Sequence, residues 1–511
     1  MTTITRRTLL KGALAFPIAM TLPRVAGAQE LLVRYDLASP EGAAMLDIYA
    51  QAAQTMQAMG PENPMSWMWQ WYHHFVSGAT NKTAELDRIF GIEPSPLRTL
   101  AEETWNTCQS HAGQNPHHFL PWHRLFVYYF ERIVRHVSGR PEFTLPYWDY
   151  TSSDLAKRGI VPWQFRRPTH PLYKSLYRAE RSSLARTGQP IHKNQPVDVM
   201  NIDDLLLKPD YQTRGRAVGF CRFMDAGIHS RIHGLVGTAR GMGRVPYAGR
   251  DPLFWVHHAN VDRMWASWVA LGRIDANPTM TWAKTRFVFA DVEGARAEHA
   301  LLDVFDMATL GYTYDNFLVP TAPKEPEPEP PTVTAAELGA AKLASRGRKP
   351  VAAGMPLTVA RAQKAAVLSA GKTEVALVPD AFEARLPFIG LDPAQPNRRT
   401  YLVLENLHAW SQPEVLFHVY VRGAASQGKG EYAGNINFFD AEFHDHGKGR
   451  AALNEALGPN FYSFDVTAAL RRMARSGAWR RNEGLVVSII PAGVPTKGSN
   501  PMVATIELAR Q

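Results

Sequence analysis

The residues in this sequence best suited to chemistry are histidines that fall into two groups. His229 and His233 are four positions apart, so on a helix they lie on one face and can hold one ion from the same side. The pair His257 and His258 follows in the run Asp251-Pro-Leu-Phe-Trp-Val-His-His-Ala-Asn-Val-Asp. Neutral imidazole is the commonest metal ligand in proteins. This group therefore predicts a metal site with three histidine ligands.

A second group lies earlier in the chain. It comprises His73 and His74 behind a tryptophan-rich segment, His111 shortly after Cys108, and His123 in the run Phe-Leu-Pro-Trp-His. Two sets of three imidazoles suit a pair of copper ions, because nitrogen ligands alone then complete both sites. Zinc is the alternative, but a catalytic zinc takes three protein ligands and a water, which accounts for only one set.

Helices are expected to bring these histidines together. Four stretches before residue 320 have helical character: 43–59, 125–137, 218–235 and 257–271. Most of the histidines fall in this part of the chain. We therefore expect a mainly α fold in which a helix bundle holds the metal.

The composition changes at residue 320. The proline- and glutamate-rich run 320–331 cannot form the interior of a helix or sheet, and small polar residues follow it, so 320–358 is expected to be an exposed linker. Alternating β-rich runs come next: 401–407, 415–421, 435–443, 484–490 and 502–508. They predict an antiparallel β-sandwich over 359–511, with one helix near 466–473 capped by Asp465.

The first 28 residues resemble a twin-arginine export signal. Arg6 and Arg7 precede an apolar stretch from Gly12 to Leu22, and a small-residue cleavage site ends at Ala28. Roughly 12 apolar residues interrupted by proline are too few for the ~20 that a membrane-spanning helix needs. We expect 1–28 to be removed and 29–319 to be the catalytic domain of a periplasmic or secreted protein.

The overall charge indicates no nucleic-acid partner. The 511 residues carry a formal net charge of +9, and four of the cations belong to the signal. No cluster of lysine and arginine with interleaved aromatic residues stands out in the remainder. The two cysteines, Cys108 and Cys221, allow one disulfide but do not indicate it.

Two motifs carry a family resemblance. The runs Phe-Leu-Pro-Trp-His123-Arg and Asp251-Pro-Leu-Phe-Trp-x-x-His258-x-x-x-Asp262 resemble the two copper-binding signatures of the tyrosinase and polyphenol oxidase family. The resemblance covers roughly 40–318, and the C-terminal part more loosely resembles the family's shielding domain. It implies a four-helix bundle holding two copper ions that bind dioxygen. The implied ligands are His74, His111 and His123 for one copper and His229, His233 and His258 for the other.

Several ligand positions keep an alternative. His257 is expected to be a packed neighbour of His258, and His73 competes with His74. The family has a histidine where this chain has Gln114, which leaves His111 as the candidate with His117 and His118 as rivals.

Residues around the ligands suggest further roles. Asp262, one turn after His258, is expected to accept that ligand's second N–H or to form a surface salt bridge. Asp225 stands where relatives carry a glutamate that holds a water, and it is a candidate acceptor for the phenol proton. Ser230 replaces an asparagine of many tyrosinases, and Val245 stands where some catechol oxidases place a phenylalanine. Cys108 is either a free thiol or a thioether partner of a histidine.

The predicted function is a type-3 copper oxidase. It would use dioxygen to oxidise small o-diphenols to o-quinones and would also hydroxylate monophenols, with no nucleic-acid or membrane partner. A catechol oxidase without monophenolase activity, a dioxygen carrier resembling the mollusc hemocyanins and a zinc hydrolase are the alternatives. The C-terminal domain is expected to keep a precursor latent, with Phe438 or Phe439 as the inserted side chain. His444 and His446 are expected to lie in a solvated turn.

Overall fold

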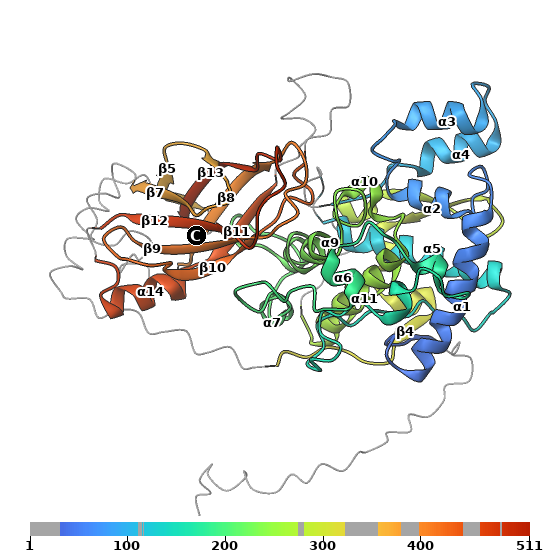
Figure 1. The fold of residues 1–511 in the computed structure, drawn as a ribbon, viewed down its shortest axis with the longest axis horizontal. Coiled ribbons are helices and arrows are strands. Elements are labelled where there is room, and N and C mark those ends of the chain that lie inside the picture. The colour runs from blue at the N-terminus through green and yellow to red at the C-terminus, as the bar shows by residue number, and fades with distance from the viewer. Residues whose placement is uncertain are drawn as a thin grey trace, which may run out of the picture.

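The protein consists of a helical body followed by a β-sheet body, which lie against each other (Figure 1). The computed structural model describes residues 31–110, 115, 117–273, 281–321, 356–379, 398–442, 460–480 and 483–511. The predicted signal, most of the predicted linker, His111, Gln114, His444 and His446 lie outside these residues. None of the helices described is long and apolar enough to cross a membrane.

Four helical segments carry the histidines of the two groups. They are α2 (Trp67–His74), α5 (Phe119–Ser138), the broken segment from α8 (Phe220–Met224) to α9 (Ser230–Val236), and α11 (Pro252–Ala270). A further long helix, α1 (Pro40–Ala58), packs on α5. The shorter helices of this body are α3 (Lys82–Phe90), α4 (Pro96–Thr104), α6 (Ser183–Thr187), α7 (Asp203–Leu206) and α10 (Val245–Ala248). The prediction that this part of the chain is mainly helical is confirmed.

Local sequence explains where the two long ligand helices begin. The Asp251 side chain accepts a hydrogen bond from the Leu253 amide, and Pro252 occupies the first helical position of α11, where its missing N–H costs nothing. Helix α5 starts at Phe119 rather than at the expected residue 125, because Pro121 lies in its first turn, where proline is tolerated. It ends at Gly139, which has the left-handed φ of 64°.

The predicted helix over 218–235 is not continuous. A π-turn, η3 (Asp225–His229), separates α8 from α9, and Gly227 within it has a non-helical ψ of −113°. Glycine tolerates this backbone because it has no Cβ. Such π-turns occur often at functional sites, and this one ends on a predicted metal ligand.

Short strands complete the helical body. β1 (Leu32–Arg34) pairs in parallel with β4 (Tyr312–Tyr314), so the first and last described parts of this body meet. β2 (Arg286–Ala290) and β3 (Arg296–Ala300) form an antiparallel pair.

The C-terminal body is one continuous antiparallel sheet. Its described strands are β5 (Leu357–Ala362), β6 (Ala366–Val367), β7 (Thr373–Pro379), β8 (Thr400–His408), β9 (Phe417–Gly423), β10 (Glu431–Ile436), β11 (Phe461–Asp465), β12 (Leu485–Pro491) and β13 (Met502–Arg510). They follow the order β10-β9-β12-β7-β5-β13-β8-β11, with β6 beside β13. The antiparallel β domain is therefore confirmed, although its strands are paired in a single sheet rather than in two.

The helix in the C-terminal body, α14 (Thr467–Ser476), falls close to its predicted position. The N-cap position is Val466 rather than the predicted Asp465, although the Asp465 carboxylate accepts a hydrogen bond from the Thr467 amide at 3.0 Å. The strand predicted over 435–443 instead ends at Ile436. The segment Asn437–Glu442, which we call the inserted turn, leaves the sheet and enters the helical body.

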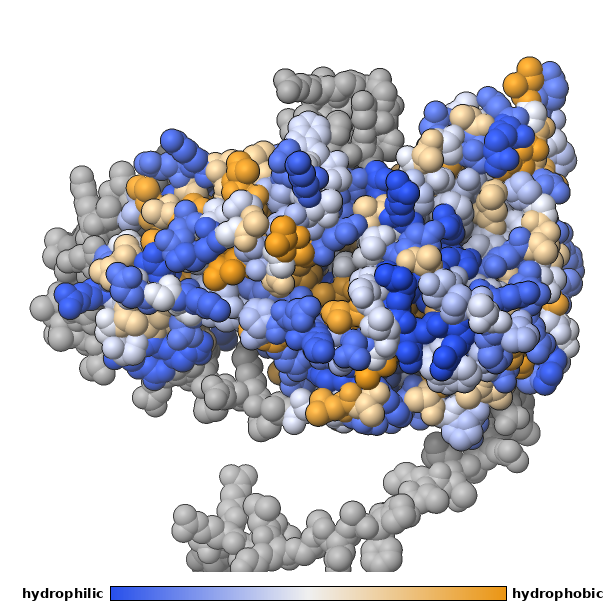
Figure 2. Space-filling model, in the orientation of Figure 1, coloured by the Kyte–Doolittle hydropathy of each residue, from blue (hydrophilic) through white to orange (hydrophobic). Residues whose placement is uncertain are grey.

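The two bodies share parts of their cores. Phe439 of the inserted turn and Leu416 pack in the core of the helical body, while Ala226 of the π-turn packs in the core of the sheet. On the face of the molecule that Figure 2 shows, apolar residues are scattered among polar ones.

Candidate metal centre

The structure gathers the C-terminal group of histidines into one buried cluster. One nitrogen from each of His229, His233, His257 and His258 lies within 4.8 Å of the others. The Nε2 atoms of His229 and His233 are 3.0 Å apart, as the spacing of four residues predicts. The π-turn and α9 supply this pair, and α11 supplies the other two.

The N-terminal group forms a second cluster beside it. His74, Cys108 and His123 offer ligand atoms within 4.8 Å of one another. The two clusters meet where the rings of His123 and His258 stack, with centroids 4.4 Å apart and planes at 9°. Two metal sites facing each other across this stack are the arrangement predicted from the sequence.

The donor set fits metal ions. The Nδ1 atom of His123 lies 2.9 Å from the Phe119 carbonyl and that of His233 lies 2.8 Å from the Met242 carbonyl. Nδ1–H donation to these carbonyls leaves each Nε2 free to bind a metal. Both ring nitrogens of buried His258 lack a hydrogen-bond partner among the described residues. A buried polar group in that state is costly unless something binds it.

The electrostatics keep these imidazoles neutral, which is the form that binds metal. Burial, and to a lesser extent the charge of His229, lowers the pKa of His123 to about 3. Burial also lowers the pKa values of His74, His233 and His258 well below the ordinary histidine value, and neighbouring histidines lower them further.

The structure distinguishes between most of the histidines that were alternative candidates for the same ligand position. His74 joins the cluster, whereas His73 packs against Phe289 with ring centroids 4.6 Å apart. His117 and His118 contact the ring of Trp282, at 5.4 Å and 5.8 Å, and neither belongs to a cluster.

The structure distinguishes less clearly between His257 and His258. Both His257 and His258 belong to the C-terminal cluster. His258 also stacks on His123, while His257 stacks on His229 at 5.4 Å and contacts Tyr150 at 5.5 Å. His258 is therefore the member that faces both clusters.

Cys108 lies inside the N-terminal cluster. Its Sγ is 3.8 Å from Nε2 of His123, and burial raises the pKa of the thiol well above its ordinary value, with a further contribution from Asp440 and Asp225. The cysteine is a free thiol. Its nearest described histidine is thus His123, whereas the sequence suggested a nearby partner such as His111.

The expected contact between Asp262 and His258 is not what the structure shows. The Asp262 carboxylate instead accepts hydrogen bonds from Arg124 at 2.5 Å, Tyr312 at 2.6 Å and Tyr314 at 2.7 Å. Arg34 adds an ion pair at 3.2 Å. Burial tends to raise the pKa of this carboxyl, but the charges of the two arginines hold it below its ordinary value. Asp262 therefore ties α11 to α5 and to the β1–β4 pair.

Asp225 lies at the C-terminal cluster, as expected of a residue one turn before His229. Its buried carboxylate is 2.9 Å from Nδ1 of His229. Ser230 donates its hydroxyl to the Asp225 backbone carbonyl at 2.7 Å, so this proton is committed within the helix. Val245 begins α10, and a hydrogen bond with its backbone opposes the lowering of the His74 pKa.

The inserted turn covers the C-terminal cluster. The ring of Phe439 stacks on His233 at 4.2 Å and 11°, and it meets His229 edge-on at 5.9 Å. Phe438 instead packs in the core of the sheet. Of the two phenylalanines predicted as candidates, Phe439 is the one that lies over the predicted ligands.

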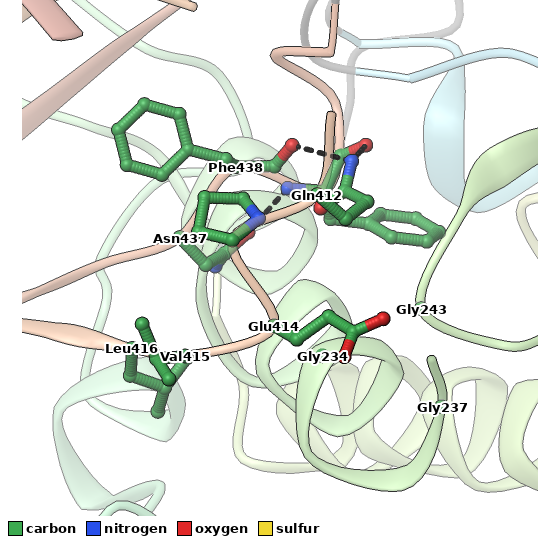
Figure 3. A pocket seen from close by; sticks show the side chains of 11 residues that line it. Gly234, Gly237, Gly243, Gln412, Glu414, Val415, Leu416, Asn437 and Phe438 are labelled. Carbon is green, nitrogen blue, oxygen red and sulfur yellow. Dashed lines mark hydrogen bonds between the residues drawn. The ribbon is translucent and has the colours of Figure 1, made fainter. Parts of the chain in front are cut away.

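Sequence reasoning missed the contacts that hold this turn. Arg244 pairs with Glu442 at 2.6 Å. The Gln412 side-chain amide donates to the Phe438 carbonyl at 2.9 Å and to Glu442 at 3.1 Å. Gln412 and Phe438 line a recess that Gly234, Gly237 and Gly243 form against the C-terminal body (Figure 3). No local motif marks them, because each pair is far apart in sequence.

A helical body in which two neighbouring side-chain clusters could each hold a metal ion is the class of site described above, and comparison with known proteins shows what the chain is similar to. The family model described as the common central domain of tyrosinase matches residues 66–176 and 166–271. A tyrosinase of Hahella sp. (strain CCB-MM4) is 30% identical over 295 residues, covering 53% of this chain and 60% of that protein. The (+)-larreatricin hydroxylase of Larrea tridentata is 30% identical over 235 residues, covering 41% and 40%. Over residues 66–271 the chain is therefore similar to the tyrosinase family.

Solved structures share the fold of both bodies. Latent apple tyrosinase matches with a TM-score of 0.57 at 20% identity, covering 94% of this chain and 98% of that one. A latent aurone synthase (polyphenol oxidase) matches with a TM-score of 0.57 at 19% identity, covering 95% and 90%. The chain aligns with 60% or less of the length of the curated relatives described above, so its activity is argued below from its own residues.

Proposed function

We propose that this protein is a type-3 copper oxidase that converts o-diphenols to o-quinones with dioxygen. The observation that carries the proposal is the stack of His123 on His258, which joins two clusters of possible metal ligands. A bound copper pair would supply dioxygen binding and electron transfer. Two diphenols would each give up two electrons and two protons, and one dioxygen would become two waters.

The proposed ligands are those that the family resemblance implies. His74, His111 and His123 would hold one copper, and His229, His233 and His258 the other. The carbonyls of Phe119 and Met242 would fix the rings of His123 and His233, which keeps Nε2 as the binding atom.

Asp225 is the proposed acceptor for the phenol proton. Its carboxylate is buried at the C-terminal cluster, and a suitably placed carboxylate can take up such a proton through a water. We propose diphenol oxidation as the main activity and monophenol hydroxylation as the slower one, because the Ser230 hydroxyl proton is already donated to the Asp225 carbonyl.

The full chain is proposed to be a latent precursor. Phe439 occupies the space above His233 where a phenolic ring would approach the metals. Cutting the linker at 320–358 would permit the β-sheet body at 359–511 to leave the catalytic domain at 29–319. Residues 1–28 are proposed to direct export by the twin-arginine route to the periplasm or beyond.

The test combines metal analysis with oxygen uptake. The full chain is loaded with copper and assayed with 4-methylcatechol and 4-methylphenol, before and after proteolysis between Pro320 and Pro350. We expect two coppers per chain, little turnover before the cut and rapid diphenol oxidation after it. A His233→Ala variant is expected to lose a copper and the activity.

Other outcomes would reject the proposal. Reversible dioxygen binding without diphenol turnover after the cut would indicate a carrier, and a single zinc per chain would indicate a hydrolase. A His233→Ala protein that kept both coppers and full activity would refute the ligand assignment.

A further inference from the structure

The inserted turn presents two chemical groups to the helical body, and together they resemble an aromatic acid. The first is the ring of Phe439, which lies 4.2 Å from and nearly parallel to the ring of His233. The second is the carboxylate of Glu442, three residues further on, which lies 2.6 Å from Nη2 of Arg244. The Glu442 side chain is 3% exposed, so this carboxylate is enclosed at the contact.

Arg244 belongs to the loop that shapes the metal site. Two residues before it, the Met242 carbonyl fixes the ring of His233. Directly after it, Val245 lies beside His74. The backbone on either side of Arg244 therefore contacts predicted ligands of both coppers, and its guanidinium lies 5.6 Å from the ring centroid of Tyr247.

The surroundings of Arg244 indicate that its guanidinium is placed to receive a carboxylate. Among the residues that the structure describes, Glu442 is the ion-pair partner found for Arg244. The Arg244 side chain is 23% exposed even with the turn in place, so it borders the entrance rather than the core. Its planar fork of N–H donors suits carboxylates in particular.

Burial of Glu442 has an energetic cost that requires compensation. Burial raises the pKa of this carboxyl, although Arg244 acts against the change. An enclosed carboxylate is stable only where charges and hydrogen bonds replace its water. Here Arg244 and the Gln412 amide, at 3.1 Å, provide them.

We propose that Arg244 is a specificity residue that binds a carboxylate of the substrate, and that Phe439 and Glu442 hold the places of the substrate's ring and acid group in the latent chain. The substrate class would be catechols that bear a carboxylate on a short side chain. This inference rests on the proposed function, because it names the substrate of the same site.

The test uses the full copper-loaded chain with both places vacated by Phe439→Gly and Glu442→Ala, which we call the opened chain. Its substrates are 3-(3,4-dihydroxyphenyl)propionate and the methyl ester of the same acid, which differ in charge but little in shape. Arg244→Gln is compared with Arg240→Gln, a matched control in the same loop whose side chain is exposed.

We expect the opened chain to prefer the acid over the ester in kcat/KM. Arg244→Gln should reduce this preference about tenfold through KM, since a hydrogen bond to a charged group contributes about 1.5 kcal/mol or more. Arg240→Gln should leave the preference unchanged. An unchanged preference in Arg244→Gln, or an equal loss in Arg240→Gln, would overturn the proposal.

A binding measurement separates this inference from the proposed activity. 3-Phenylpropionate has no phenol group and cannot be oxidised at the site, so its Kd is measured by calorimetry on the same variants. The Kd should rise about tenfold in Arg244→Gln and stay constant in Arg240→Gln. If neither catechol is oxidised, the proposed function fails while the calorimetry still decides the role of Arg244. The linker-cut chain without other substitutions provides the same comparison if the opened chain does not fold.

Discussion

Acidification is expected to loosen the contact between the two bodies through His418. This residue of β9 is buried, and its Nε2 lies 2.9 Å from the side-chain oxygen of Gln195 in the helical body. Burial, together with the charges of Arg231 and Lys429, lowers the pKa of His418 to about 4. Separation of the bodies would expose the ring to water and return its pKa towards the ordinary value of about 6.5.

The direction of this pH dependence follows from the number of protons that the docked and separated states bind. Between about pH 6.5 and pH 4, the separated state binds a proton on His418 that the docked state does not bind. Docking is therefore strongest above pH 6.5 and weakens as the pH falls through this window. At pH 5 the difference is about 2 kcal/mol, or roughly thirtyfold in the docking equilibrium.

Glu442 acts in the opposite direction. Burial raises the pKa of its carboxyl in the docked state, so protonation of this group favours docking as the pH falls. A His418→Gln variant isolates the histidine, because glutamine keeps a polar end towards Gln195 but does not titrate. Its matched control is His136→Gln, which changes an exposed histidine of α5.

The assay measures dissociation of the linker-cut chain by analytical ultracentrifugation between pH 7.5 and pH 5. At pH 5 the dissociation constants of the wild type and of His136→Gln should have risen, relative to pH 7.5, by about thirtyfold more than that of His418→Gln. His418→Gln should lose most of that dependence. The same pH dependence in all three proteins would refute the reasoning.

Three further predictions concern the metal site and its supports. Phe439→Ala should give the uncut chain diphenol oxidase activity, measured as oxygen uptake, whereas continued latency would exclude this ring as the cover. Asp262→Asn should lower the free energy of unfolding by about 3–5 kcal/mol because it leaves the buried Arg124 without its charge partner, and urea denaturation that shows a loss below 1 kcal/mol would contradict this. His74→Ala should reduce the copper content to about one ion per chain while His73→Gln retains both, and metal analysis giving the reverse would exchange their roles.

The sequence predicted the regions of α5, α9 and α11 but not helix α2, which carries His74. The spacing of His229 and His233 predicted their common face, whereas α11 begins at Pro252, five residues before the predicted start. These features are local, so a few neighbouring residues determine them. The choice of His74 over His73 as a ligand stays a prediction, and of the two only His74 belongs to the cluster of possible metal ligands.

The parts that escaped prediction depend on residues far apart in the chain. Asp262 could not be assigned from its position one turn after His258, because Arg34 and Tyr312, which bind it, come from the two ends of the helical body. The break at Gly227 gave no signal against the helical pattern around it. The prediction of a strand beyond Ile436 was wrong because backbone groups of the inserted turn form hydrogen bonds with other segments. The Phe438 carbonyl, for example, accepts a hydrogen bond from the Gln412 side chain.

The parallel pairing of β1 with β4 has a mechanical consequence. Leu32, Val33 and Arg34 lie opposite Tyr312, Thr313 and Tyr314 in the same direction, so a pull on the two outer ends of this pair loads its hydrogen bonds in shear. Bonds loaded in shear must break together, whereas bonds at the end of a hairpin can open one after another. Tension applied through the linker would therefore act on the paired strands β1 and β4 rather than on an unpaired strand. The helical body is built to resist being unravelled from its ends when the other body is pulled away.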